Sequence, residues 1–177
     1  MTLDLSVYLV TGRELLPPGK DYFVSLEESI RDGHVPIVQI REKSASFQEF
    51  LDIARASLTI CDKYHVRMII NDSIDVAEHL PERVGLHIGQ DDMAFREARE
   101  KLGEGQLIGL SIGSNEELAA IADDARPDVI GIGPVHSTAT KKNAPAGMGT
   151  AAAAALAHAA HERGIESVAI GGIKTHN

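Results

Sequence analysis

The sequence predicts an α/β protein built from parallel βαβ units. Short runs rich in β-branched residues recur along the 177 residues, and each is followed by a loop and a helix-like segment. Aromatic residues make up only 4% of the chain, so Val, Ile, Leu and Ala must fill the core. That filling is typical of a parallel sheet buried on both faces. We expect a single domain over residues 1–177.

Seven runs are short and apolar enough to be fully buried strands. They are Val7–Val10, Ile37–Ile40, Met68–Ile70, Leu86–Ile88, Leu107–Leu110, Val129–Ile132 and Val168–Ile170. Strands that alternate with helices form either a TIM-type barrel or an open doubly wound sheet, and periodicity does not choose between them. The first run lacks the GxGxxG pattern that marks a dinucleotide-binding sheet.

Apolar spacing and capping residues predict the helices. In residues 47–64, apolar side chains recur every three or four positions and mark one helix face. Ser114 and Glu117 form a capping-box pattern. Thr150 is a candidate N-cap for an Ala-rich helix, and Gly164 stands where a helix end favours a left-handed residue.

The composition excludes several classes of protein. A formal net charge of −9 argues against bulk attraction to nucleic acid or anionic membranes. No apolar run approaches the ~20 residues that span a bilayer, and the N-terminus lacks the pattern of a signal peptide. Cys61 is the single cysteine, so no intrachain disulfide can form and we expect a buried, reduced thiol. The sequence thus predicts a cytoplasmic protein.

Polar residues gather where the predicted strands end, which is where barrel enzymes place their active sites. After the second run, alternation puts Gln39, Arg41 and Lys43 on one side and Glu42 on the other. Two cations on the barrel side suit a phosphate. The alternative is a pair of solvated loop charges that pair with Glu42 or a nearby acid.

Acidic residues follow the next two runs. Asn71 and Asp72 come after the third, and Asp91 and Asp92 after the fourth. Carboxylates from adjacent strand ends could share one Mg²⁺, which commonly takes one or two protein carboxylates plus substrate phosphates. The alternative is that Asp91 or Asp92 caps a helix over residues 93–101.

The later loops carry small polar groups and glycines. Ser111 could contact a polar substrate edge or satisfy a backbone group, while Thr138, Thr140 and Lys141 make a plausible anion-binding loop or a plain basic loop. Gly172 follows the seventh run, where paired glycines allow close approach of a phosphate or form a tight turn. His87 lies inside a strand run, and we expect a packed, hydrogen-bonded histidine there.

In this order, the segments resemble the thiamine-phosphate synthase family. The matching stretches are YLVTG (8–12), QIREK (39–43), IINDSID (69–75), GLHIGQDD (85–92), IGLSIG (108–113), DVIGIGPVHSTATKKN (128–143) and VAIGGI (168–173). The long first loop is most similar to the fungal forms, which are fused to a hydroxyethylthiazole kinase. The resemblance implies a TIM-type (β/α) barrel with eight strands, of which this chain carries seven. We therefore expect a C-terminally truncated form without the eighth βα unit.

The resemblance also implies the reaction. The substrates are 4-amino-2-methyl-5-pyrimidinylmethyl diphosphate and 4-methyl-5-(2-hydroxyethyl)thiazole phosphate; the products are thiamine phosphate and pyrophosphate. The implied cofactor is Mg²⁺, and neither nucleic acid nor a membrane is a partner. The resemblance leaves room for a homo-oligomer and for a kinase domain in a longer form. The alternative is a non-catalytic relative that binds thiazole phosphate or thiamine phosphate, or an inactive truncated form.

Site residues follow from the resemblance position by position. Arg41, Lys43, Asn71 and Lys141 hold the diphosphate, Asp72 and Asp92 ligate Mg²⁺, Gln39 and Ser111 meet the pyrimidine, and Thr138, Thr140 and Gly172 meet the thiazole phosphate. Arg41, Lys43 and Lys141 are the implied catalytic cations. The chain departs from the family pattern at Ser73, where an Arg is usual, and at Ser137, where a Pro is usual.

Overall fold

The computed structural model describes residues 3–138, 140, 146–174 and 176–177. Strands and helices alternate along the chain. The strands are β1 (Tyr8–Thr11), β2 (Ile37–Ile40), β3 (Arg67–Asn71), β4 (Gly85–Ile88), β5 (Ile108–Ile112), β6 (Val129–Ile132) and β7 (Glu166–Ala169). The helices are α1 (Tyr22–Gly33), α2 (Phe47–Lys63), α3 (Ile74–Glu78), α4 (Phe95–Leu102), α5 (Asn115–Ala120) and α6 (Thr150–Glu162), with a 3₁₀ turn η1 (Arg13–Leu15).

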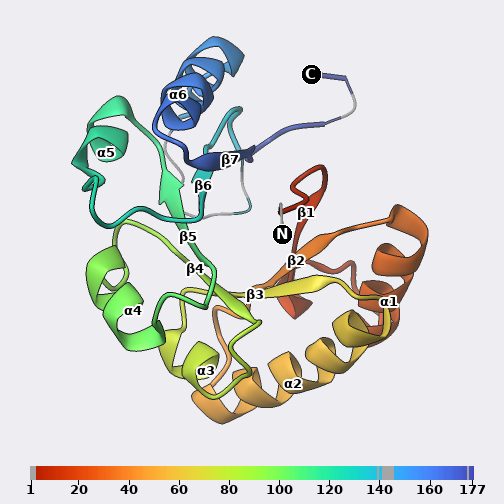
Figure 1. Cartoon of the computed structure of the whole chain (residues 1–177). Helices are drawn as coiled ribbons and strands as arrows, with labels where there is room; N and C mark the ends of the chain where they lie inside the picture. The colour runs from red at the N-terminus through yellow and green to blue at the C-terminus, as the bar shows by residue number, and fades with distance from the viewer. Residues whose placement is uncertain (1–2, 139, 141–145, 175) are drawn as a thin grey trace.

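The strands form one parallel sheet whose spatial order is the chain order, β1 to β7. The sheet curls, and the helices lie outside the curve (Figure 1). Among the described residues β1 and β7 are the two ends of the sheet and do not pair with each other. The expected α/β class is confirmed, and the TIM-type geometry holds in outline as an open, curled half-barrel.

Burial follows position in the sheet. The strands β2, β4 and β6 are buried at every residue, because each has a strand on both sides and helices outside. The end strand β7 is different: its residues are exposed or half-buried, and the next residue, Ile170, is 47% exposed. The expectation that all seven runs are fully buried was therefore wrong for β7, and also for β1, whose residues are all half-buried; neither end strand has a neighbour on its outer side among the described residues.

Two of the three predicted caps are present. Ser114 Oγ accepts a hydrogen bond from the backbone N of Glu117 at 3.2 Å. Gly164 has φ +71°, as a left-handed helix end requires. Thr150 is not the N-cap of α6: it is the first helical residue, and the N-cap position is Gly149, whose φ of 83° suits glycine.

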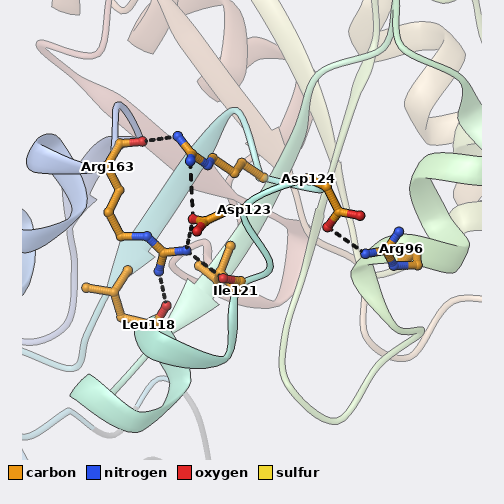
Figure 2. A network of polar contacts seen from close by, with 7 residues as sticks. Arg96, Leu118, Ile121, Asp123, Asp124 and Arg163 are labelled. Carbon is orange, nitrogen blue, oxygen red and sulfur yellow. Dashed lines mark hydrogen bonds and ion pairs between the residues drawn. The ribbon is translucent and has the colours of Figure 1, made fainter.

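A polar network ties α5 to the end of α6 (Figure 2). The guanidinium of Arg163 donates to the backbone oxygens of Leu118 and Ile121, both at 2.5 Å, and to Asp123 at 3.1 Å. Carbonyl groups at a helix end lack partners within the helix. Arg163 supplies side-chain donors to the carbonyls of Leu118 and Ile121, which lie 45 and 42 residues before it in the sequence.

Among the described residues, no helix combines the length and the apolar character needed to cross a membrane.

Candidate active site

The described residues of the predicted site all lie at or beyond the carboxyl ends of the strands. Gln39, Arg41, Lys43, Asn71 and Asp72 belong to the ends of β2 and β3, Asp92 and Ser111 to those of β4 and β5, and Thr138, Thr140 and Gly172 to the loops after β6 and β7. Lys141 lies outside the described residues. Parallel strands bring these ends to one edge of the sheet.

Lys43, one of the two cations after β2, reaches the end of β3. Lys43 Nζ forms an ion pair with a carboxylate oxygen of Asp72, although 29 residues separate the two in sequence. Glu42 faces the other way: its side chain is 2% exposed and pairs with Arg13. The predicted alternation is thus present, and Lys43 pairs with the acid of the neighbouring strand end and not with Glu42.

Asp72 sits in an unusual backbone turn. Its φ is 61°, in the left-handed region that most residues avoid, and the backbone N of Ser73 bonds to the backbone oxygen of Asn71 at 2.8 Å. This is a γ-turn centred on Asp72, a rare and strained form. Asp72 N bonds His87 O at 2.8 Å, so β4 holds the turn in place. Ser73 then caps α3 by accepting from Val76 N at 3.4 Å.

Asp92 is directed to the site and does not cap α4. Its Oδ2 accepts a hydrogen bond from the backbone N of Gly89 at 2.7 Å. The N-cap of α4 is Ala94, which offers no side-chain bond, so the capping alternative was wrong. Burial raises the pKa of the Asp72 carboxyl above its usual range; the bond from Lys43 lowers it, and the nearby Asp92 carboxylate raises it.

These two carboxylates fit a magnesium ion. The Asp92 carboxylate raises the pKa of Asp72, and a cation bound between the two would oppose that effect. Within the described ranges, no group of three or more His, Cys, Asp or Glu side chains could hold a metal. A site with two carboxylates suits Mg²⁺, which completes its shell with water and substrate phosphates, better than a metal that needs an all-protein cage.

A chain of buried polar groups lies beneath this edge. Gln39 Nε2 donates to the Tyr8 hydroxyl at 3.0 Å, and the Tyr8 ring meets the His87 ring edge-on at 6.4 Å. His87 Nε2 lies 3.0 Å from Ser111 Oγ. Burial raises the pKa of Tyr8 to about 12 and lowers that of His87 to about 4, so both are neutral at pH 7. His87 is thus packed and hydrogen-bonded, as expected.

Two contacts near this edge, one made by Tyr8 and one by Gln90, were not predicted from the sequence. Tyr8 begins β1 and opens the matching stretch 8–12, but no role was assigned to it, and its hydroxyl accepts the hydrogen bond of Gln39. Gln90 donates to the backbone oxygen of Ser111 at 2.7 Å and so joins the loop after β4 to β5. The contact of Tyr8 with Gln39 follows from the adjacency of β1 and β2, whose register sets Val10 against Gln39.

The predicted thiazole-phosphate residues also meet. A Cβ on Gly172 would lie 2.7 Å from the backbone oxygen of Ser137, and the φ of Gly172 is +63°. The loops after β6 and β7 are therefore in contact, and only glycine fits at this position. Thr140 N donates to Thr138 Oγ1 at 3.2 Å, which places both hydroxyls in the same loop.

Comparison with known proteins agrees with this geometry. The model of the family described as thiamine monophosphate synthase matches residues 7–177. The chain belongs to the thiamine monophosphate synthase family. It is 39% identical over 174 residues to the thiamine-phosphate synthase of Halalkalibacterium halodurans, covering 98% of this chain and 79% of that protein. The fold is similar to a thiamine phosphate pyrophosphorylase structure from Pyrococcus furiosus, with TM-score 0.76, 27% identity, and 94% and 75% of the two chains covered.

Some relatives in this family are longer proteins. The chain is 38% identical to the thiamine biosynthetic bifunctional enzyme of Saccharomyces cerevisiae and to the thiamine biosynthesis multifunctional protein ThiED of Corynebacterium glutamicum. The match to the yeast enzyme spans 99% of this chain but only 33% of that protein, and the match to the Corynebacterium glutamicum protein spans 98% of this chain but only 23% of that protein. The identity to the yeast enzyme does not exceed that to the bacterial ones, so a fungal-like form stays a prediction.

Proposed function

We propose that this chain catalyses the synthase reaction of its family, joining 4-amino-2-methyl-5-pyrimidinylmethyl diphosphate to 4-methyl-5-(2-hydroxyethyl)thiazole phosphate. The proposal rests on one observation: Lys43, Asp72 and Asp92 lie close together at the ends of β2, β3 and β4. A site for a diphosphate and Mg²⁺ requires one or two carboxylates with a cation beside them.

The reaction breaks the C–O bond between the pyrimidine methylene and the diphosphate. The bonding electron pair leaves with pyrophosphate, so negative charge grows there and positive charge grows on the methylene carbon. The thiazole nitrogen then donates its lone pair to that carbon and forms the C–N bond. This nitrogen carries no proton, so the reaction needs no general base.

Fixed positive charge at the leaving group is the main requirement, because preorganised electrostatics act on charge that develops in the transition state. Arg41 and Lys43 would bind the diphosphate oxygens, with Asn71 as a neutral donor and Lys141 from the loop after β6. When bound by Asp72 and Asp92, Mg²⁺ would supply further positive charge at the same oxygens.

The two organic rings would be bound by the other strand ends. The Gln39 amide and the Ser111 hydroxyl would hydrogen-bond the pyrimidine, and their neutral partners Tyr8 and His87 keep both groups oriented. Thr138, Thr140 and Gly172 would bind the thiazole phosphate, which the contact between the loops after β6 and β7 supports.

The test is formation of thiamine phosphate from both substrates with Mg²⁺, comparing the unaltered chain with Asp92→Asn and Asp91→Asn. Both acids are exposed neighbours in one loop, so the substitutions are matched in charge and place. We expect Asp92→Asn to lose activity by roughly 100-fold or more and Asp91→Asn to keep it within about twofold. Equal activity of the two variants would contradict the metal assignment.

A binding-only role is the second candidate, and the exposed end strand favours it. Ile170 and Ile173, which flank the paired glycines, are 47% and 51% exposed, so the thiazole-phosphate side is open in the described residues. We propose that a further βα unit packs on β7 in the catalytically competent protein. If the folded 177-residue chain binds thiamine phosphate yet forms none from the two substrates, the binding role is supported.

A further inference from the structure

One buried carboxylate joins the loop after β1 to the loop after β2. Glu42 Oε1 accepts a hydrogen bond from the backbone N of Arg13 at 2.8 Å, and Glu42 Oε2 accepts one from Arg13 Nε at 2.9 Å. The Glu42 side chain is 2% exposed and that of Arg13 is 42% exposed. Both carboxylate oxygens are therefore bound to a single residue of the preceding loop.

The backbones of the two loops are also in close contact. The backbone N of Arg41 donates to Thr11 O at 2.7 Å, which extends the β1–β2 pairing past the end of β2. A Cβ on Gly12 would lie 1.9 Å from the backbone oxygen of Arg41 and 3.5 Å from Glu42 Oε1. The segment 41–43 is thus held by Thr11, Gly12 and Arg13 together.

This attachment decides where the neighbouring cations point. In extended backbone, successive side chains face opposite sides. Glu42 is fixed toward Arg13, and the next side chain, Lys43, reaches the opposite side, where it meets Asp72. Loss of the contacts between Glu42 and Arg13 would release the backbone of this segment, and with it the positions from which Arg41 and Lys43 extend.

We propose that Glu42 and Arg13 are positioning residues for the leaving group: they orient Arg41 and Lys43 toward the pyrophosphate without contacting it. The inference rests on the proposed function and adds two residues to its machinery. Residues that orient charged ligand-binding groups from outside typically change affinity by roughly 10- to 100-fold when replaced.

The experiment compares Glu42→Gln with Glu49→Gln. Glu49 accepts from Arg13 Nη1 at 2.8 Å but is exposed, so its substitution removes a charge from the same guanidinium without freeing the segment 41–43. The measurement is the Kd for inorganic pyrophosphate in the presence of Mg²⁺, by calorimetry on the folded protein. We expect Glu42→Gln to weaken binding roughly tenfold or more and Glu49→Gln to change it less than about twofold.

A second variant, Arg13→Lys, covers the case in which Glu42→Gln does not fold. It keeps the charge and the bond from the backbone N of residue 13 to Glu42 Oε1, but it loses the bond from Nε to Glu42 Oε2, and its half-exposed position tolerates the change. We expect about tenfold weaker pyrophosphate binding, and no further loss when Glu42→Gln is added, because the two residues act as one unit.

A purely structural role would lower the melting temperature and leave the Kd of the folded protein unchanged. If Glu42→Gln, or Arg13→Lys where the first does not fold, binds pyrophosphate as tightly as the unaltered chain, the inference is overturned while the proposed function stands. If the unaltered chain does not bind pyrophosphate with Mg²⁺, the proposed function fails and the inference with it.

Discussion

Replacing His87 by Gln should make the free energy of unfolding less dependent on pH between 7 and 5. His87 is buried between β3 and β5, its Nε2 is bound to Ser111, and its Nδ1 has no partner among the described residues. Burial lowers the pKa of the imidazole to about 4, while in the unfolded chain it returns to about 6.5. The folded protein therefore resists protonation at this site.

Proton linkage sets the direction and the size of this change in the free energy of unfolding. Below pH 6.5 the unfolded chain binds a proton that the folded protein does not, so His87 lowers stability as the pH falls, and the loss is complete below pH 4. A difference of that size between the two pKa values makes the loss about 2 kcal/mol between pH 7 and pH 5. In His87→Gln this contribution disappears, since Gln has no titrating group.

The assay is urea unfolding of both proteins at pH 7 and pH 5, and the quantity of interest is the difference between the two pH-dependent losses. Asp72, whose pKa is raised, contributes to both proteins and cancels in this difference. His158→Gln is the matched control, because His158 lies on the exposed face of α6 with 76% of its side chain accessible. Equal losses in the unaltered chain and His87→Gln would refute the reasoning.

Three further predictions follow from single contacts. Gly12→Ala should destabilise the fold by about 3 kcal/mol or prevent folding, because its Cβ would lie 1.9 Å from the Arg41 backbone oxygen; chemical denaturation measures the change. Arg163→Met should lower stability by about 2 kcal/mol in the same assay, since it removes the side-chain donors to the Leu118 and Ile121 carbonyls and leaves Leu118 O only the longer bond from Ile121 N, whereas Arg96→Met, which removes only an exposed pair with Asp124, should change stability by less than about 1 kcal/mol (Figure 2). Cys61 should react with a thiol reagent only after unfolding, because burial raises its pKa to about 12; rapid labelling of the folded protein would contradict this.

The strands were largely predictable because burial on both faces leaves a distinct apolar run. The bounds of β2 and β6 coincide with the predicted runs Ile37–Ile40 and Val129–Ile132. The last strand was displaced: β7 begins at Glu166, a charged residue that an apolar pattern rejects. Its register is fixed by pairing with β6, where Glu166 stands opposite Val129. Backbone pairing at the end of a sheet does not require an apolar side chain, so hydrophobicity alone misses it.

The candidate site likewise contains residues that the sequence could group and contacts that it could not predict. Residues on one strand end, such as Arg41 and Lys43, could be grouped by alternation alone. The ion pair of Lys43 with Asp72 depends on the adjacency of β2 and β3, which the βαβ pattern implied but did not prove. The contact of Glu42 with Arg13 left no sequence signal, since an acid between two cations suggests pairing with its neighbours.

Several locally unfavourable features lie together at the candidate site. Asp72 has a left-handed backbone, its buried carboxyl stands beside Asp92, and the imidazole beneath it has a nitrogen without a partner in the described part of the chain. Each feature costs free energy of folding, on the order of 1–3 kcal/mol for the backbone turn alone. A cation bound between β3 and β4 would relieve the repulsion of the two carboxylates, so these features support the proposed function.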